Sequence, residues 1–211
     1  IVVMSDSHRR TSLLLNIIER HKDNADLFLF LGDGNDDLDN ALMIYPDIKI
    51  DRVSGNCDFY STYPASKVID FAGKRILFTH GHPYYVKHGY SDIQREARSV
   101  GADICLFGHT HIPYVDIIDS IHYMNPGSVS IPKEGNIPTY AVLEDGIFTI
   151  KGFECEIVKT LDLNEKGTEK AVVKAPVGEL TVTVLAIGKN SIAEQWERIG
   201  HTTSTKTIQN T

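Results

Sequence analysis

Five short apolar runs each end directly in a cluster of small, acidic or imidazole side chains, and this pattern constrains the fold more than any other feature of the chain. The runs cover residues 1–4, 27–31, 48–53, 75–79 and 104–107. Near-continuous apolar runs of this length are typical of strands that are buried on both faces. The sequence therefore predicts a layered sheet structure with polar loops at the strand ends.

Helical patterns lie between several of these runs. Leu13–Ile18 has the apolar spacing of an amphipathic helix, and Thr11 or Ser12 is a suitable N-cap. Asp36–Tyr45, which ends before a proline, and Ser91–Val100, which ends before a glycine, indicate two more helices. Strands that alternate with helices favour an α/β layered fold.

Beyond residue 112 the pattern changes to short strands between Gly and Pro turns, which is typical of an antiparallel addition. The expected strands are Tyr114–Ile118, Thr139–Leu143, Ile147–Ile150 and Phe153–Thr160. We divide the chain into a domain over residues 1–162 and an extension over residues 163–211. In the extension we expect a strand at Leu180–Ile187, a short helix at Ser191–Ile199 and a mobile Thr/Ser-rich end.

Composition narrows the class of protein. The chain has 211 residues, of which 21 are Lys or Arg and 28 are Asp or Glu, so the formal net charge is −7. This acidic balance argues against a protein that coats nucleic acid. No apolar run approaches 18 residues, no leader pattern is visible, and the three cysteines are scattered. We expect a cytoplasmic protein without membrane attachment.

The loops that follow the five runs contain the residue types that bind metal ions. The residues in question are Asp6, His8, Asp33, Asn56, His80, His109 and His111. The carboxyl ends of parallel strands lie along one edge of a sheet, so these loops are expected to converge. Asp, Asn and His supply oxygen and neutral imidazole ligands to divalent ions. The pattern thus predicts a metal centre.

The ordered series DxH, GDxxD, GN, H and GHxH resembles the calcineurin-like metallophosphoesterase superfamily. The short chain, the sequence GNCD at 55–58 and the sequence NPGS at 125–128 are similar to its small bacterial and archaeal phosphodiesterase branch, which also includes a eukaryotic retromer subunit. The resemblance covers about residues 1–160. It implies a four-layer αββα sandwich, in which helices flank two mixed β-sheets and a dinuclear metal site lies at the strand C-terminal ends.

The resemblance also implies a role for each loop residue. One metal ion would be held by Asp6, His8 and His111. The other would be held by Asn56, His80 and His109, and Asp33 would bridge the two. The expected cofactors are two divalent ions, Mn²⁺ first, with Ni²⁺, Zn²⁺, Fe²⁺ and Mg²⁺ as alternatives. Two such ions can clamp a phosphate and activate a shared hydroxide for in-line attack on phosphorus.

The sequence departs from the wider superfamily at Cys57, where a histidine commonly protonates the leaving group. A thiol with a reference pKa of about 8.5 is a poor replacement at neutral pH. We therefore expect either a preference for good leaving groups or another acid, such as His82. The candidate catalytic residues are Cys57, Asp58 and His82. Whether His82 contacts substrate, and whether Asp58 only orients a ligand, is left open.

Two function classes compete at this stage. The first is a metal-dependent phosphoesterase, specifically a phosphodiesterase that hydrolyses a small phosphoester. The alternative is a non-catalytic metal-binding scaffold of the retromer-subunit type. The seven intact ligand residues favour the enzyme. The expected partner is a small phosphoester substrate, without extended nucleic-acid or membrane binding, and the oligomeric state, including a homo-oligomer, is open. Tyr84, Tyr85 and Tyr90 could line a substrate pocket or serve packing.

Overall fold

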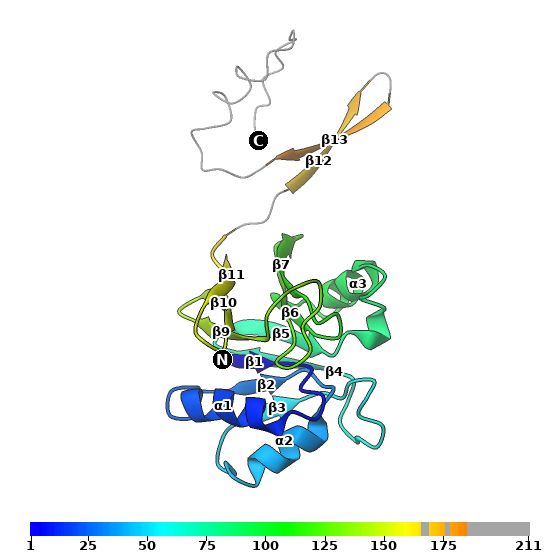
Figure 1. Ribbon diagram of the computed structural model, residues 1–211. Helices are drawn as coiled ribbons and strands as arrows, with labels where there is room; N and C mark the ends of the chain where they lie inside the picture. Colours follow the sequence, from blue (N-terminus) through cyan, green and yellow to red (C-terminus); the bar gives the residue numbers. More distant parts are fainter. Residues whose placement is uncertain (166–168, 176–177, 185–211) are drawn as a thin grey trace. The chain divides into compact units, whose positions relative to one another are not determined.

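The computed structural model describes residues 1–165, 169–175 and 178–184, and the chain divides into two units, Ile1–Gly167 and Thr168–Thr211. The first unit contains two β-sheets and all the described helices (Figure 1). The second contains an antiparallel hairpin of β12 (Glu169–Ala175) and β13 (Gly178–Val184).

The first sheet has six strands. Across the sheet they are β11 (Ile157–Asp162), β10 (Ile147–Gly152), β9 (Thr139–Glu144), β1 (Val2–Met4), β2 (Phe28–Phe30) and β3 (Ile50–Arg52). β1, β2 and β3 run parallel, whereas β9 to β11 are antiparallel to their neighbours. The parallel half therefore directs three strand C-termini to one end of the sheet.

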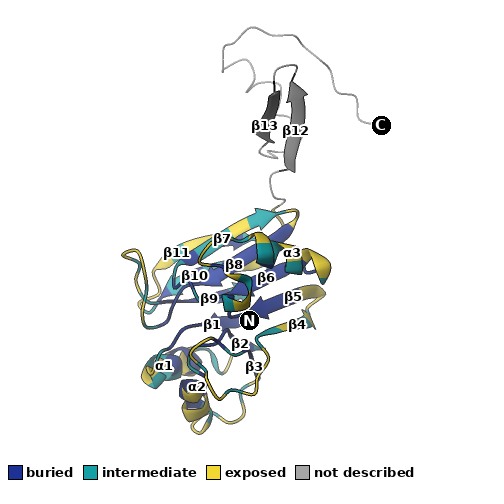
Figure 2. Ribbon diagram, turned by 90° about the vertical axis from the view of Figure 1, so that its right-hand side faces the viewer, coloured by how far each residue is buried: buried dark blue, intermediate teal, exposed yellow. Residues whose placement is uncertain are grey.

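The second sheet has five strands. Across the sheet they are β4 (Ser66–Phe71), β5 (Lys74–Thr79), β6 (Ile104–Phe107), β8 (Ile121–Pro126) and β7 (Pro113–Ile118). β5, β6 and β8 run parallel, and the edge strands β4 and β7 run antiparallel to their neighbours. Figure 2 shows that burial decreases toward these edge strands.

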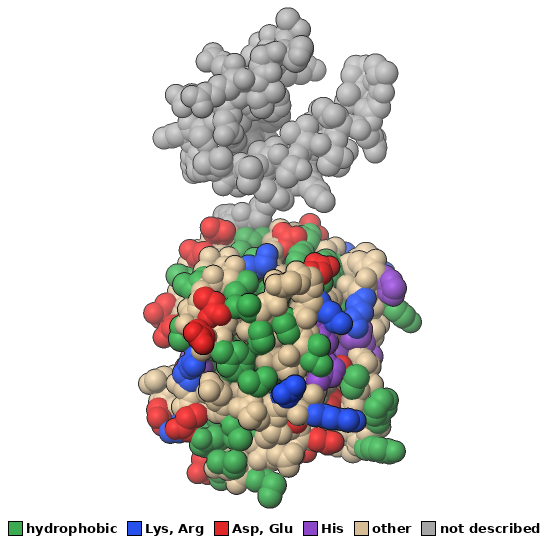
Figure 3. Space-filling view, viewed as in Figure 1, with side chains coloured by type: hydrophobic (Ala, Val, Ile, Leu, Met, Phe, Trp, Pro, Cys, Tyr) green, Lys and Arg blue, Asp and Glu red, His purple; other side chains and the backbone are tan. Residues whose placement is uncertain are grey.

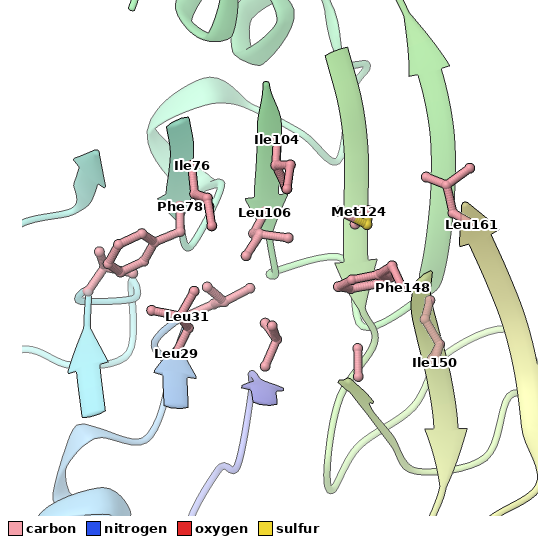
Figure 4. Packing of buried hydrophobic residues seen from close by; sticks show 13 residues of the cluster. Leu29, Leu31, Ile76, Phe78, Ile104, Leu106, Met124, Phe148, Ile150 and Leu161 are labelled. Carbon is pink, nitrogen blue, oxygen red and sulfur yellow. The ribbon is translucent and has the colours of Figure 1, made fainter. Parts of the chain in front are cut away.

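The main core lies between the two sheets. Leu29 and Leu31 from the first sheet face Phe78 and Leu106 from the second (Figure 4). Helices α1 (Thr11–His21) and α2 (Asn35–Leu42) bury their apolar faces on the outer side of the first sheet. Helix α3 (Ser91–Ser99) does the same on the second sheet, after the short 3₁₀ helix η1 (His82–Tyr84). The four-layer αββα sandwich is thus confirmed.

Burial on both faces explains the continuous apolar runs. Successive residues of a strand point to opposite faces, so Val3 enters the core between the sheets while Val2 and Met4 pack beneath the helices. A strand that must be apolar on both sides cannot show the alternation of a half-exposed strand. The same argument applies to β6, which is buried along its whole length.

Several elements differ from the sequence-based expectations. The N-cap position of α1 is Arg10, not Thr11 or Ser12, and it forms no side-chain capping hydrogen bond. Strand β4 was not anticipated because it is a largely exposed edge strand without an apolar run. Strand β8 was also missed, and it extends to Pro126 within the NPGS sequence.

The structure describes only part of the C-terminal region for which we stated expectations. Strand β11 begins at Ile157, later than expected, and β13 overlaps the expected strand up to Val184. The expected helix at Ser191–Ile199 and the Thr/Ser-rich end lie outside the described residues. Among the helices that the structure describes, none has the length and apolar content needed to cross a bilayer.

The inter-sheet core predicts a large cost for truncating Phe78, whose side chain is fully buried. Phe78→Ala should lower the free energy of unfolding by about 3–5 kcal/mol, because the substitution removes apolar contacts and leaves a cavity between the sheets. Chemical denaturation of the metal-free protein measures this change. Phe59→Ala is the matched control, since Phe59 is 83% exposed. Equal effects of the two substitutions would contradict this description of the core.

Candidate metal centre

The polar loops from both sheets meet at one end of the sandwich. Asp6 follows β1, and its Oδ1 lies 3.1 Å from Nε2 of His111, which follows β6 of the other sheet. Asp33 follows β2, and its Oδ2 lies 3.3 Å from Nε2 of His80, which follows β5. Convergence therefore occurs as expected, but across two facing sheets rather than along one edge. Figure 3 shows histidine side chains gathered on this side, with Lys and Arg beside them.

One group of potential ligands consists of Asp6, His8 and His111, whose ligand atoms lie within 4.8 Å of one another. Nε2 of His8 lies 3.2 Å from Nε2 of His111 and 3.7 Å from Oδ1 of Asp6. Asp6 is fully buried, and the two imidazoles lie nearer the surface. This is the set expected for the first metal ion.

A second group consists of Asp33, His80 and His109, within the same 4.8 Å limit. Nε2 of His80 lies 3.1 Å from Nδ1 of His109. Oδ2 of Asp33 also lies 3.8 Å from Nε2 of His8, so this carboxylate reaches both groups. That position is the one expected for a bridging ligand.

Asn56, the remaining expected ligand, is exposed on the loop after β3. Its Nδ2 donates a hydrogen bond to Sγ of Cys57 at 3.3 Å. Cys57 in turn donates its backbone N–H to Oδ1 of Asp33 at 2.7 Å. The structure thus links Asn56 to Asp33 through Cys57, and among the described residues no hydrogen bond joins the Asn56 side chain to His80 or His109.

These residues fit a divalent metal ion. Oδ1 of Asp6 is buried and has no hydrogen-bond partner among the described residues. An isolated buried carboxylate oxygen is costly unless a donor or a cation satisfies it. The paired imidazole nitrogens face each other at hydrogen-bond distance, where neutral rings offer lone pairs to a metal. The donor set of oxygen and nitrogen atoms suits Mn²⁺, Zn²⁺ and similar ions.

Backbone carbonyls orient two of the imidazoles. His80 donates its Nδ1–H to the carbonyl oxygen of Leu31 at 2.8 Å, and His111 donates its Nδ1–H to that of Ile131 at 2.6 Å. A carbonyl can only accept, so each contact fixes the proton on Nδ1 and leaves Nε2 directed at the centre.

The carboxyl groups of the site are ionised. Burial raises the pKa of Asp6, but the neighbouring imidazoles of His111 and His8 outweigh burial and hold that pKa well below its usual range. Burial raises the pKa of Asp33 as well, but the neighbouring His80 has the larger effect and lowers this pKa to about 2. Both side chains therefore have the charge that a metal ligand needs.

The imidazoles of the site differ in the direction in which their pKa values are shifted. The neighbouring carboxylate of Asp6 raises the pKa of His8. Burial lowers the pKa of His80, but the carboxylates of Asp33 and Asp6 outweigh burial and leave that pKa raised. Burial and the positive charge near His80 lower the pKa of His109 to about 4. In the metal-free centre His8 and His80 therefore keep their protons to a higher pH than free imidazoles do, and a metal ion competes with these protons.

Five of the seven expected ligands have left-handed backbone conformations. They are Asp6 (φ 59°), His8 (φ 43°), Asp33 (φ 58°), His109 (φ 69°) and His111 (φ 61°). Non-glycine residues seldom adopt this region, and such strain is retained where the surroundings enforce it. The centre is therefore built from turns that the rest of the fold must stabilise.

The carboxylate of Asp58 lies behind these turns. It accepts hydrogen bonds from the backbone N–H groups of Asp33, Gly34, Asn35 and Gly55 at 2.7–2.9 Å, and from Nδ2 of Asn35 at 3.0 Å. Five donors occupy the acceptor sites of both oxygens, so neither oxygen is free to exchange a proton with a substrate. The contacts tie the loop after β2 to the loop after β3.

Two glycines permit this close approach of the loops. A Cβ at Gly32, where φ is +92°, would lie 2.4 Å from the backbone nitrogen of Gly55. A Cβ at Gly55 would meet Oδ1 of Asp33 at 2.1 Å. Only glycine fits at either position.

The remaining candidates lie at the edge of the centre. The ring of His82 lies 5.4 Å from that of His80, burial lowers its pKa, and its buried Nδ1 has no partner among the described residues. Burial, reinforced by Asp33, raises the pKa of the Cys57 thiol to about 11. Of the three candidate pocket tyrosines, Tyr84 contacts Ser66, Tyr90 contacts other aromatic rings, and Tyr85 is largely exposed.

Two further residues support the centre. Asp37 in α2 accepts four hydrogen bonds from the segment that follows Asp6, and sequence reasoning missed it. Asn125 belongs to the NPGS sequence, to which the sequence analysis assigned no contact. It donates Nδ2 to the carbonyl oxygen of Gly108 at 2.9 Å and supports the turn before His109. The four-residue sequence NPGS marked the region of Asn125, whereas nothing local marks Asp37.

The raised pKa values of His8 and His80 predict that metal affinity increases with pH. Below those pKa values protons compete with the ion for the same nitrogens, and above them the competition ends. Titration of the metal-free protein with Mn²⁺ in buffers of different ionisation enthalpy measures both affinity and proton release. His88→Ala, an exposed histidine outside the groups, should leave both quantities unchanged. Affinity independent of pH between 5 and 8 would contradict the assignment of these histidines.

Comparison with known proteins identifies the same superfamily that the sequence motifs resemble. The sequence model of the calcineurin-like phosphoesterase superfamily domain matches residues 1–145. A probable metallophosphoesterase of Bacillus subtilis, YsnB, is 30% identical over 157 residues, which is 73% of this chain and 90% of that protein. The phosphodiesterase YfcE of Escherichia coli is 32% identical over 111 residues, which is 48% of this chain and 56% of YfcE.

Solved structures share the fold. A predicted phosphoesterase from Streptococcus pneumoniae superposes with a TM-score of 0.62 at 25% identity, covering 87% of this chain and 96% of that one. Wild-type Vps29 of Entamoeba histolytica in complex with Zn²⁺ has a TM-score of 0.60 at 20% identity, covering 77% and 98%. With the domain match over residues 1–145 and the grouped carboxylates and imidazoles at the strand ends, the chain belongs to the calcineurin-like phosphoesterase superfamily.

Proposed function

We propose that the protein is a dinuclear metal-dependent phosphodiesterase that acts on a small phosphoester. The observation that carries this proposal is the position of Asp33, whose carboxylate lies within 4 Å of a histidine from each ligand group. A shared carboxylate between two sets of ligands is the arrangement that two neighbouring divalent ions require. Membership of the superfamily supports phosphoester hydrolysis as the reaction class.

The ligand residues divide between two ions. Asp6, His8 and His111 would hold one, Asn56, His80 and His109 would hold the other, and Asp33 would be shared. When bound, such ions polarise the phosphoryl oxygens and supply a nucleophilic water. The chain itself fixes the direction of His80 and His111 through their Nδ1 contacts with backbone carbonyls. Residues that are already oriented reduce the reorganisation needed when substrate binds.

Neither candidate acid in the site is strong. With its pKa raised to about 11, the Cys57 thiol keeps its proton at neutral pH but gives it up reluctantly. His82, with a lowered pKa, is a neutral imidazole at that pH and carries no extra proton. We assign Asp58 to the support of the loops, because five donors surround it. The enzyme should therefore depend on substrates whose leaving groups need little protonation.

The non-catalytic scaffold is the competing function. Its discriminating feature would be the loss of ligand residues, and here the seven expected ligands are all present in the sequence. The Vps29 structures are less than 25% identical to this chain, so they support the fold and not a scaffold role. The acidic net charge of −7 favours a small substrate over an extended nucleic-acid strand.

Turnover of bis-p-nitrophenyl phosphate tests the proposed reaction. The metal-free protein should be inactive, and Mn²⁺ should restore hydrolysis of the diester in preference to p-nitrophenyl phosphate. His80→Ala should lower kcat/KM by more than the roughly 10–100-fold that loss of a supporting contact costs. Asp92→Ala, which removes an exposed carboxylate on α3, is the control. Two tightly bound metal ions without turnover of any phosphoester would instead support the scaffold.

Replacing the weak acid tests the role of position 57. Cys57→His should raise the rate on diesters with alkyl leaving groups by about 10²-fold, the lower end of general acid catalysis, because an imidazolium can protonate the departing oxygen. The rate on bis-p-nitrophenyl phosphate should change little. Cys155→His, at an exposed cysteine beside Arg20, serves as the control. An unchanged ratio of the two rates would show that protonation of the leaving group does not limit the reaction.

A further inference from the structure

Asp37 in helix α2 is a buried carboxylate whose hydrogen-bond partners all come from one distant segment. Its Oδ2 accepts hydrogen bonds from Oγ of Ser7 at 2.6 Å and from the backbone N–H groups of Arg9 and Arg10 at 2.8 and 3.2 Å. Its Oδ1 accepts one from Oγ1 of Thr11 at 2.9 Å. These four donors belong to the five residues that join the first metal-binding turn to helix α1.

Helix α1 has no capping side chain of its own. Its N-cap residue forms no side-chain hydrogen bond, and its first turn contains no acidic residue. A negative charge near the start of a helix interacts favourably with the helix dipole. Asp37, from a different helix, places such a charge there and accepts hydrogen bonds from the backbone N–H of the N-cap residue Arg10 and from the hydroxyl of Thr11.

The segment that Asp37 holds is strained. Asp6, His8 and Arg9 all have left-handed backbone conformations, with φ of 59°, 43° and 67°. Residues keep such conformations only where the surroundings determine them. The N–H groups of Arg9 and Arg10 can meet one carboxylate oxygen because the chain turns in this way directly after His8.

Gly34 makes the contact sterically feasible. A Cβ at this position would lie 1.8 Å from Oγ of Ser7, and the backbone φ of +147° is unfavourable for other residues. The hydroxyl of Ser7 occupies that space when it donates to Asp37. The glycine at the start of α2 therefore leaves the space that the turn with Asp6 and His8 needs.

We propose that Asp37 is a positioning residue for the first metal ion. By fixing residues 7–11 it holds the imidazole of His8 against His111 and Asp6, so that the three ligands are arranged before the ion binds. Asp58 provides the corresponding support for Asp33 and the loop after β3. Each ligand group therefore has its own supporting carboxylate, which is buried at Asp37 and half-buried at Asp58. The inference rests on the proposed two-metal centre and does not depend on which phosphoester is hydrolysed.

Asp37→Asn tests this role. An amide is uncharged and has one acceptor oxygen. If that oxygen meets Ser7, Arg9 and Arg10, these hydrogen bonds lose the assistance of the carboxylate charge, and the NH₂ group faces the Thr11 hydroxyl, which must turn to accept. Calorimetric titration of the metal-free protein with Mn²⁺ should show one ion bound about 10–100-fold more weakly, with the affinity of the other retained. Mn²⁺ electron paramagnetic resonance should change from a spin-coupled pair to an isolated ion. Asp58→Asn should weaken the bridged second group instead.

Asp36→Asn is the matched control. Asp36 is the neighbouring residue of the same helix, it loses the same charge, and its side chain is exposed without a hydrogen bond among the described residues. The Asp36→Asn protein should bind two Mn²⁺ ions with the affinities of the unaltered protein. If Asp37→Asn does not fold, Thr11→Val removes one of the four donors and should cause a smaller loss for the same ion.

A purely structural role gives a different result. Asp37→Asn would then lower the unfolding temperature of the metal-free protein while both Mn²⁺ affinities and the coupled spectrum stayed unchanged, and this outcome would overturn the inference. Failure of the proposed function is distinguishable, because it would appear as absence of turnover in the unaltered protein while the metal titrations remained informative.

Discussion

The contact of His80 with the loop after β2 connects the two sheets at the metal centre, and the site depends on it. The side chain is fully buried, donates through Nδ1 to the carbonyl oxygen of Leu31, and presents Nε2 to Asp33 at 3.3 Å. One imidazole therefore joins the second sheet to a backbone group and a side chain of the first. Because the two sheets pack face to face, the distance between them, which the shared core determines, also determines the distance between the ligands of one sheet and those of the other.

The centre also carries a large electrostatic cost. Asp6 is completely buried, Asp33 is nearly so, and four imidazoles crowd around them. Without a cation, protonated histidines must neutralise the carboxylates, which is the origin of the raised pKa values of His8 and His80. An ion that binds only the folded chain replaces these protons and stabilises the fold by mass action. Metal binding, protonation and stability are thus linked through the same few atoms.

The parts of this structure that were predictable from sequence are those that depend on local patterns. Strand β6 is continuous in apolar residues because both faces are buried, and the ligands follow the strand ends directly. Strand β4 was not predictable in this way, because an edge strand with an exposed face has no such run. The same limit applies to Asp37, which holds the segment before α1. It is separated from its partners by 26–30 residues, and in the sequence it is one of two adjacent helical aspartates.

The strained turns of the centre follow from a conflict between two requirements. A left-handed conformation is easiest for glycine, but glycine has no ligand atom, so Asp and His must occupy those positions. Glycine is used instead where another loop approaches too closely for a Cβ, as at Gly32 and Gly34. The cost at the ligand positions must be met by hydrogen bonds from outside each turn. Asp37 and Asp58 accept eight such hydrogen bonds between them, and Asp58 accepts a ninth from Gly55 in its own loop. This explains why two carboxylates that touch no ligand side chain lie beside the turns of the site.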